Sequence, residues 1–199
     1  MFTGIIADIG IIADKQDREG GLRLRIDTNN LGMGDVQLGD SIAVNGVCLT
    51  AIKLEGDSFT VDVSRETLHC TVGLEQQGAQ VNLEKAMRLA DRLGGHLVSG
   101  HVDGVGEVLE FVNLGESWKL SVRAPKDLAK YIAAKGSITI NGVSLTVNKV
   151  EGAVFHVNLI PHTLQETTLK GLHPDSRVNL EIDLIARYVE RMMTSSSQC

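Results

Sequence analysis

The sequence predicts an all-β protein with two tandem, homologous, six-stranded Greek-key β-barrels, which arose by internal duplication and are followed by a C-terminal α-helix. Three observations predict this fold. A ten-residue stretch occurs twice, both halves contain series of short strands, and the end of the chain has one helical stripe. The chain has 199 residues, so each half has about 90, close to the lower practical limit for an independent core.

The repeated stretch reads SIAVNGVCLT at residues 41–50 and SITINGVSLT at residues 137–146, an offset of 96 residues (137 − 41). Cys48 of the first copy is Ser144 in the second. Further segments align at this offset, the last with one residue of slippage: TGII 3–6 with SGHV 99–102, SRETL 64–68 with IPHTL 160–164, and VNLE 81–84 with VNLE 178–181.

An offset that holds over most of the chain indicates that a whole domain was duplicated. We therefore expect an N-terminal barrel over residues 1–94 and a C-terminal barrel over residues 95–183. Residues 184–199 are expected to form an oligomerisation helix and its tail.

Each half is patterned as short strands separated by Gly, Asn or Asp. RLRI at 23–26 and KLSV at 119–122 alternate polar and apolar residues. Asn45-Gly46 and Asn141-Gly142 predict tight hairpins, because both residue types accept positive φ. About six short antiparallel strands in each half suit a closed barrel, which has no exposed sheet edge. A short helix at 125–134 fits between strands of the second half.

The C-terminal segment LIARYVERMM, residues 184–193, places apolar residues on one face at helical spacing. A lone helix of this length is not stable in water, so its stripe needs a partner. The barrels could cover it, but the identical helix of a neighbouring subunit fits as well. We expect self-association.

Composition excludes several functions. The net charge is −6 and no run of Lys or Arg occurs, which argues against nucleic-acid binding. The three cysteines lack CxxC spacing, which argues against a disulfide framework and a zinc site. No apolar stretch is long enough to cross a membrane, and the first ten residues do not resemble a signal peptide. We expect a cytoplasmic protein.

Six motifs occur in one order from Met1 to about Arg191: MFTGII, SIAVNGVCLT, GGHLVSGHVDG, GSITINGVSLTVN, LIPHTL and VNLEIDLIARYVER. In this order the chain resembles the riboflavin synthase family of the α-chain type, which binds lumazine in tandem barrels. The resemblance implies a homotrimer held partly by the C-terminal helices, and no cofactor. It also implies a functional association with lumazine synthase.

The activity implied by the resemblance is that of a transferase, in the last step of riboflavin biosynthesis. Two 6,7-dimethyl-8-ribityllumazine molecules bind per site, and one donates a four-carbon unit to the other. The products are riboflavin and 5-amino-6-ribitylamino-pyrimidinedione. Each site joins the N-terminal barrel of one subunit to the C-terminal barrel of its neighbour. Two similar but unequal barrels suit two identical substrates in different roles, which is how we interpret Cys48 opposite Ser144.

His101 is the expected acid–base group, since it matches a family motif and its counterpart in the first repeat is Ile5. The alternative is a structural histidine in a Gly-rich turn. His96 lies five residues earlier, and an odd separation puts the two on opposite faces of a strand, so we expect no shared metal site.

Ser144 and Thr146 alternate on one strand face after an Asn-Gly turn, as do Cys48 and Thr50. We expect Cys48, Ser144 and Thr146 to be catalytic, against the alternatives of an inert buried thiol and ordinary strand residues. Ser41 resembles a family position near the site but could merely open a strand.

Phe2 resembles a residue that the family needs for activity, although it could only anchor a strand. Asp183 resembles a family carboxylate near the site, and a helix N-cap is the alternative. Lys135 matches a ligand-contacting lysine, against a solvated surface lysine. His162 stands where many members of the family have an acid, so a ligand contact and no contact are both left open at this position.

The resemblance assigns substrate contacts to segments of both repeats. Those in the first repeat are Gly4, Ile5, Ile6, Cys48, Leu49, Thr50, Asp62, Val63, Ser64, Arg65, Glu66 and Thr67. Those in the second are Gly100, His101, Val102, Lys135, Ser144, Leu145, Thr146, Asn158, Leu159, Ile160, Pro161, His162, Thr163 and Asp183.

Two other functions are alternatives to this activity. Lumazine-carrying antenna proteins share the duplicated fold and bind without turnover, but Cys48, His101, Ser144 and Thr146 are all present, as a synthase requires. Flavin-dependent reductases use a similar barrel with a GxGxxG domain. Gly104-Val105-Gly106 lacks the third glycine and has the pattern of a strand.

Overall fold

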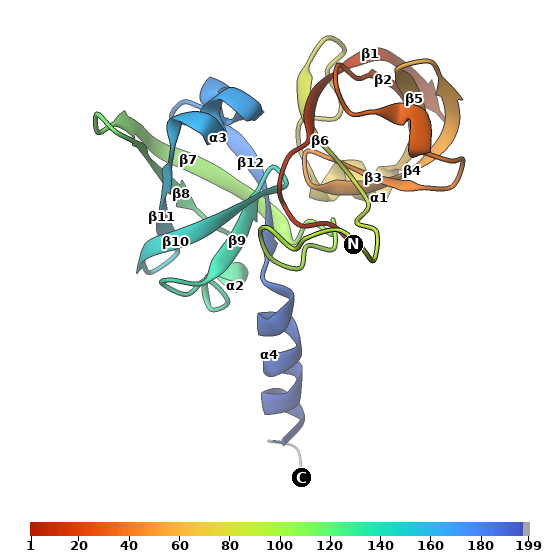
Figure 1. Ribbon diagram of the computed structural model, residues 1–199. Helices are drawn as coiled ribbons and strands as arrows, with labels where there is room; N and C mark the ends of the chain where they lie inside the picture. Colours follow the sequence, from red (N-terminus) through yellow and green to blue (C-terminus); the bar gives the residue numbers. More distant parts are fainter. Residues whose placement is uncertain (197–199) are drawn as a thin grey trace.

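A computed structural model describes residues 1–196 and contains two closed six-stranded barrels and a C-terminal helix (Figure 1). The predicted fold class is confirmed. Residues 197–199, with Cys199 and the end of the predicted tail, lie outside the described part of the chain.

The first barrel closes in the order β1-β2-β5-β4-β3-β6, and all its pairs are antiparallel. Its elements, with a 3-10 turn η1 and a helix α1, are β1 (Asp8–Arg18), β2 (Gly21–Asp27), η1 (Met33–Asp35), β3 (Ser41–Val44), β4 (Val47–Glu55), β5 (Ser58–Ser64), α1 (Arg65–Cys70) and β6 (Gln80–Lys85).

The second barrel repeats this topology with the order β7-β8-β11-β10-β9-β12. Its elements, and the final helix, are β7 (Gly104–Asn113), β8 (Trp118–Arg123), α2 (Lys126–Ala129), β9 (Ser137–Ile140), β10 (Val143–Glu151), β11 (Val154–Leu159), α3 (Pro161–Glu166), η2 (Thr168–Gly171), β12 (Arg177–Ile182) and α4 (Leu184–Ser196).

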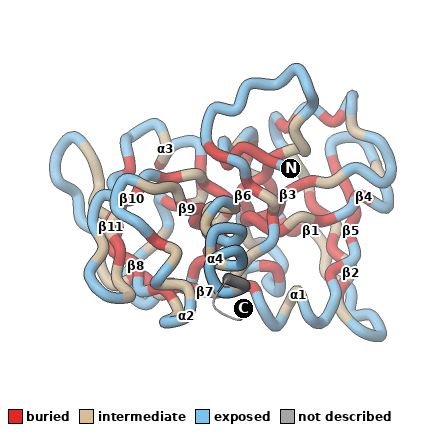
Figure 2. Tube along the Cα trace, turned by 90° about the horizontal axis from the view of Figure 1, so that it is seen from below, coloured by how far each residue is buried: buried red, intermediate tan, exposed pale blue. Residues whose placement is uncertain are grey.

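Each barrel encloses its own apolar core, because alternate strand residues point inward. In β2, Leu22, Leu24 and Ile26 are buried and the residues between them are not. The same alternation fills the second barrel, with Phe155 and Val157 of β11 at its centre. Seen from below, the buried residues lie along the strands and in the segment at the N-terminus, whereas most of α4 is exposed (Figure 2).

The two predicted hairpins lie together at a pseudo-twofold axis. Asn45 and Asn141 have φ of 47° and 48°, as tight Asn-Gly turns require. Gly46 and Gly142 (142 − 46 = 96) touch, since a Cβ on Gly46 would lie 2.7 Å from the nitrogen of Gly142. The contact of equivalent residues shows that the two barrels face each other with their repeats inverted.

Two asparagines of the last strands join the barrels across this axis. Asn82 Nδ2 donates to the carbonyl of Asn141 at 2.9 Å, and Asn179 Nδ2 donates to the carbonyl of Asn45 at 3.0 Å. All four asparagines are at least partly buried, so each bond satisfies a polar group at the interface.

The segments that precede the first strand of each repeat also pair with each other. We call residues 2–6 strap 1 and residues 98–102 strap 2. Phe2 and Val98, equivalent at the offset of 96, form an isolated antiparallel bridge with N–H···O distances of 2.8 and 3.0 Å. Phe2 is fully buried and packs with Val98 and Ala43. The N-terminus therefore lies between the two barrels (Figure 1).

The second half differs from expectation in its helices. The helix predicted at 125–134 is a single turn, α2, because the chain then continues in turns: Tyr131 N–H bonds the carbonyl of Leu128, and Lys135 has φ of 67°. The short helices α1 and α3, which the strand pattern did not indicate, follow β5 and β11.

Helix α4 starts at Leu184, as predicted, but runs to Ser196, and it extends away from both barrels (Figure 1). Arg187 pairs with Asp103 at 2.9 Å, and Glu190 bonds Lys130 and Tyr131, so one side of its base is fixed to the second barrel. Ile185, Tyr188 and Val189 are exposed. Within residues 1–196 there is no helix that is both long and apolar enough to span a bilayer.

Candidate active site

Each strap lies on the barrel of the other repeat and completes a site there. Strap 2 contacts β4: the N–H of Cys48 donates to the carbonyl of Gly100 at 2.8 Å, and Val102 packs on the core of the first barrel. Cys48 and Thr50 point outward from β4, because Leu49 between them faces the core. His101 is exposed beside Gly100. We call this arrangement, with α1, the Cys48 site.

Strap 1 makes the equivalent contacts on β10. The N–H of Ser144 donates to the carbonyl of Gly4 at 2.8 Å, and Ile6 packs on the core of the second barrel. Ser144 and Thr146 point outward from β10 on either side of Leu145. Ile5, at the place of His101, is 51% exposed. We call this arrangement, with α3, the Ser144 site.

Glycine is required where each strap approaches its strand. Gly4 and Gly100 have φ of 75° and 78°, in the left-handed region. A Cβ on Gly4 would lie 2.6 Å from Cβ of Ser144, and one on Gly100 would lie 2.7 Å from Cβ of Cys48. Both sites are therefore assembled through a backbone contact that no other residue type permits.

A buried carboxylate holds each strap. Glu84 of β6 accepts from the N–H and hydroxyl of Thr3, both at 2.7 Å, and from the N–H of Gly4 at 3.0 Å. Glu181 of β12 accepts in the same way from Ser99, at 2.7 and 2.6 Å, and from Gly100 at 2.9 Å. The duplication has thus preserved the carboxylate together with the strap that it binds.

Comparisons with known proteins agree with this duplicated site. Residues 3–86 and 99–183 each match the lumazine binding domain family. The chain is 50% identical over 194 residues to riboflavin synthase of Photobacterium leiognathi, covering 97% of this chain and 89% of that protein. It is 39% identical to riboflavin synthase of Bacillus subtilis, covering 100% and 92%. The chain belongs to the riboflavin synthase family.

Solved structures show the same architecture. The crystal structure of LumP complexed with riboflavin has a TM-score of 0.84 and 28% identity, covering 92% of this chain and 99% of that one. LumP complexed with 6,7-dimethyl-8-(1'-D-ribityl) lumazine has a TM-score of 0.80 and 27% identity, with the same coverage. The tandem barrels of the riboflavin synthase family are thus also those of proteins solved with a bound lumazine or flavin.

Among the residues that the family resemblance assigns to substrate, Thr50 lies on β4, the residues from Asp62 to Ser64 on β5, and those from Arg65 to Thr67 in α1. Thr50 and Asp62 are on the outer face of neighbouring strands β4 and β5. Asp62 is held by Arg23 through two hydrogen bonds of 2.7 Å, and that hydrogen bonding lowers the pKa of its carboxyl. Ser64 caps α1 by accepting from the N–H of Thr67. Arg65 and Glu66 are exposed in the first turn of α1.

The second repeat has the matching arrangement. Asn158 lies outward on β11, next to the strand of Thr146, and Ile160 and Pro161 begin α3. His162 and Thr163 follow in its first turn, with His162 exposed. Lys135 donates its backbone N–H to the carbonyl of Val147 at 2.7 Å. It therefore lies beside the residue of β10 at which pairing with β11 begins.

Four of the assigned strand residues face inward. Leu49 and Val63 belong to the core of the first barrel, and Leu145 and Leu159 to that of the second. Their side chains are therefore directed away from the outer faces that carry Cys48 and Ser144. Only their backbone groups are available to a ligand there.

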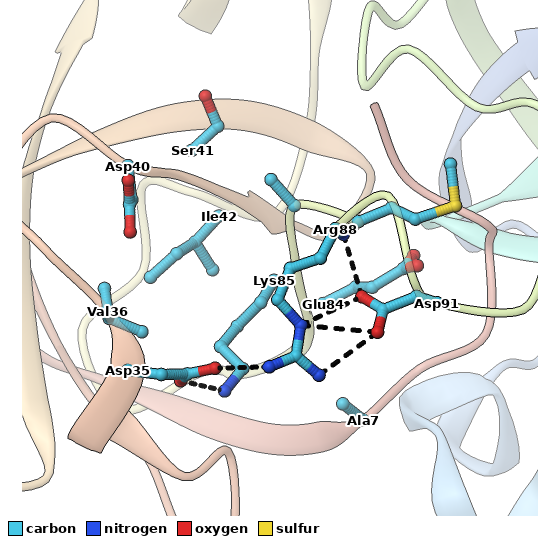
Figure 3. Close-up of a pocket in the computed structure, with 12 residues that line it drawn as sticks. Ala7, Asp35, Val36, Asp40, Ser41, Ile42, Glu84, Lys85, Arg88 and Asp91 are labelled. Atoms are coloured by element: carbon cyan, nitrogen blue, oxygen red, sulfur yellow. Dashed lines mark hydrogen bonds and ion pairs between the residues drawn. The ribbon is translucent and has the colours of Figure 1, made fainter.

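Phe2, Asp183 and Ser41 have structural surroundings of their own. Phe2 is buried, and Cys48 packs against its cluster, so it supports the Cys48 site from beneath. Asp183 Oδ1 accepts from the N–H of Ile185 at 3.0 Å, which caps α4. Ser41 pairs with Thr50 in the β3–β4 register and lines a hollow of about 400 Å³ with Glu84, Lys85 and Arg88 (Figure 3).

Sequence reasoning missed Glu84 and Glu181, and it weighed His96 only as a metal ligand. The signal for the two glutamates was present, since VNLE occurs in both repeats and so keeps an acid at equivalent strand positions. In residues 1–196, no three His, Cys, Asp or Glu side chains are grouped so that they could hold a metal ion.

Burial raises the pKa of both Glu84 and Glu181, and their hydrogen bonds with the straps act in the opposite direction. A carboxyl whose pKa is higher in the folded than in the unfolded protein stabilises the fold most below its unfolded pKa, near the ordinary value of 4.5. This contribution is lost as the pH rises through the raised pKa. The part of the unfolding free energy that these two carboxyls supply should therefore fall above about pH 4.5.

A variant that cannot ionise should lack this fall. We expect the unfolding free energy of Glu181→Gln to change less between pH 5 and pH 8 than that of the wild type. The difference should be at most about 1.4 kcal/mol for each unit by which the pKa is raised, because part of the contribution is already lost below pH 5. Urea unfolding at both pH values measures it, with the exposed Glu116→Gln as control. Identical pH slopes in wild type and Glu181→Gln would contradict the expectation.

Proposed function

We propose that this chain is a riboflavin synthase. It converts two molecules of 6,7-dimethyl-8-ribityllumazine into riboflavin and 5-amino-6-ribitylamino-pyrimidinedione by transfer of a four-carbon unit. Full-length identity of 50% and 39% to riboflavin synthases supports this activity. Because two identical molecules yield both products, the reaction consumes no outside oxidant or reductant.

The observation that carries the proposal is a pair of sites that share one backbone arrangement but carry different side chains. In each, a strap of one repeat crosses to an outer strand of the other. Beside the crossing strap, the Cys48 site pairs a thiol with His101, whereas the Ser144 site pairs a hydroxyl with the apolar Ile5. Two similar cradles suit two copies of one heterocycle, and their different side chains suit separate donor and acceptor roles.

Specific roles follow for the assigned residues. Cys48, Thr50 and His101 would contact one lumazine, and Ser144 and Thr146 would contact the other. The 7-methyl group of the lumazine is acidic because its carbanion delocalises into the ring system. The protein's main contribution is therefore the orientation of two bound molecules, for which the gain can reach about 7–11 kcal/mol.

Helix α4 supports a homotrimer in which the N-terminal barrel of one subunit meets the C-terminal barrel of a neighbour. Its base is fixed to the second barrel by Arg187 and Glu190, while Ile185, Tyr188 and Val189 stay exposed. An exposed apolar face on a projecting helix suits contact with the identical helices of other subunits. The cytoplasmic location and the association with lumazine synthase stay expectations from the sequence.

The test is incubation of the purified protein with the lumazine alone, in the presence of EDTA and without nucleotide. Riboflavin absorbance should grow, with two lumazines consumed for each riboflavin formed. Folded protein that yields no riboflavin would refute the proposal. Likeness to LumP favours a second function, ligand binding without turnover, which a bright and unchanging lumazine complex would reveal.

A further inference from the structure

His96 is buried against Ser144, in a position that the reaction as described above does not use. Its side chain lies with Nδ1 2.7 Å from Oγ of Ser144, and the residue is only 9% exposed. The backbone N–H of His96 donates to the carbonyl of Thr3 in strap 1 at 3.1 Å. The histidine therefore contacts both parts of the Ser144 site, the strand residue and the strap.

The preceding glycine makes this placement possible. A Cβ on Gly95 would lie 2.1 Å from the carbonyl oxygen of Thr3 and 2.9 Å from Oγ of Ser144. A side chain at this position would therefore collide with the strap and with the serine together. The linker between the barrels passes through this gap only as glycine, and it delivers the next residue, His96, onto the serine hydroxyl.

The other ring nitrogen of His96 determines which way the hydrogen bond runs. Nε2 is shielded from solvent and has no hydrogen-bond partner within residues 1–196. Burial lowers the pKa of His96, against the nearby charge of Asp183, which favours a neutral ring. Because buried N–H groups without an acceptor are rarer than buried acceptors without a donor, we assign the proton to Nδ1.

With this tautomer, Nδ1–H donates to Oγ of Ser144, so that the serine hydroxyl hydrogen is left for a third group. We propose that His96 is a positioning residue that fixes the Ser144 hydroxyl as a hydrogen-bond donor to a carbonyl or ring nitrogen of the heterocycle bound at the Ser144 site. The inference rests on the proposed function for the identity of that heterocycle.

The same geometry makes the two sites unequal beyond the exchange of sulfur for oxygen. Among residues 1–196, Cys48 has no hydrogen-bond partner for its thiol, and a thiol is itself a weak donor. Only the Ser144 site therefore presents a strong donor whose direction is fixed by a neighbour. The pseudo-twofold axis relates the backbones of the sites but not this hydrogen bond.

Three substitutions at His96 separate positioning from bulk. In His96→Asn the amide occupies the place of Nδ1, in His96→Gln it occupies the place of Nε2, and His96→Ala removes both. We expect His96→Ala to slow riboflavin formation about tenfold, the order expected for losing one such hydrogen bond. His96→Asn should restore most of the rate and His96→Gln should not.

Each variant is also made in the Ser144→Ala background, where His96 has no hydroxyl to orient. There the three substitutions should produce no further loss. His173→Asn, at an exposed histidine, is the matched control and should behave as wild type. The midpoint of urea unfolding identifies any variant that does not fold. If His96→Ala does not fold, the comparison of His96→Asn with His96→Gln still tests the inference.

Equal rates for His96→Ala and wild type would overturn the inference. Rescue by Gln as complete as that by Asn would also overturn it, as would losses that multiply with Ser144→Ala. If the wild type makes no riboflavin, the proposed function is wrong. The affinities of the same variants for lumazine, measured by fluorescence titration, then test the role of His96: affinity should fall in His96→Ala, recover in His96→Asn and not recover in His96→Gln.

Discussion

Gly100→Ala is expected to reduce riboflavin formation at least about 100-fold while both barrels stay folded. A Cβ at this position would lie 2.7 Å from Cβ and 3.0 Å from the nitrogen of Cys48. Strap 2 must then lift from β4, breaking the 2.8 Å hydrogen bond between Cys48 and Gly100 and moving His101. A displacement of about 1 Å near reacting groups can cost about 10²-fold. Steady-state rates with the lumazine measure this loss.

The matched control for this substitution is Gly78→Ala. Gly78 has φ of 84°, close to the 78° of Gly100, but a Cβ there meets nothing within 4 Å. The control therefore carries the same backbone strain, about 1–2 kcal/mol, without the clash. Equal losses of activity in the two variants would show that strain, and not the seating of strap 2, causes the effect.

Cys48→Ser and Ser144→Ala are each expected to slow turnover about 100-fold and to weaken riboflavin binding much less. Both residues point outward from the strand position where a strap crosses, so they are placed to act on a ring atom and not to fill volume. Turnover number and the Kd for riboflavin separate the two effects. Equal losses in both quantities would mean that these side chains only line the sites.

Ser117→Ala serves as the control for these variants, because it removes a hydroxyl in the β7–β8 turn, which belongs to neither site. It should keep wild-type turnover. A fall in this variant would indicate that the assay reports stability and not chemistry.

The barrels could be predicted because their signals are local. The alternation of the strands and the Asn-Gly turns depend on residues close in sequence, and the repeated stretch indicates the duplication. The helix predicted at 125–134 was too long, because the gap between the strand patterns does not reveal the turns around Tyr131 and Lys135. The boundaries at 94 and 183 stay predictions.

The assembly of the site could not be predicted from such signals. The contact of Gly4 with Ser144 joins residues 140 positions apart (144 − 4) in different barrels. No periodicity encodes it. His96 was interpreted by its spacing from His101, which is meaningful for a strand, whereas the structure has no regular strand between the two. Its hydrogen bond to Ser144 depends on the path of the linker.

The crossing of strap 1 onto β10 also has a consequence for the order of synthesis. Residues 2–6 leave the ribosome well before the strand that they bind, Val143–Glu151. Because domains usually fold in the order of their synthesis, the first barrel can close while its leading peptide has no docking surface. Strap 1 therefore stays undocked until β10 has been made, and the Ser144 site forms after the Cys48 site.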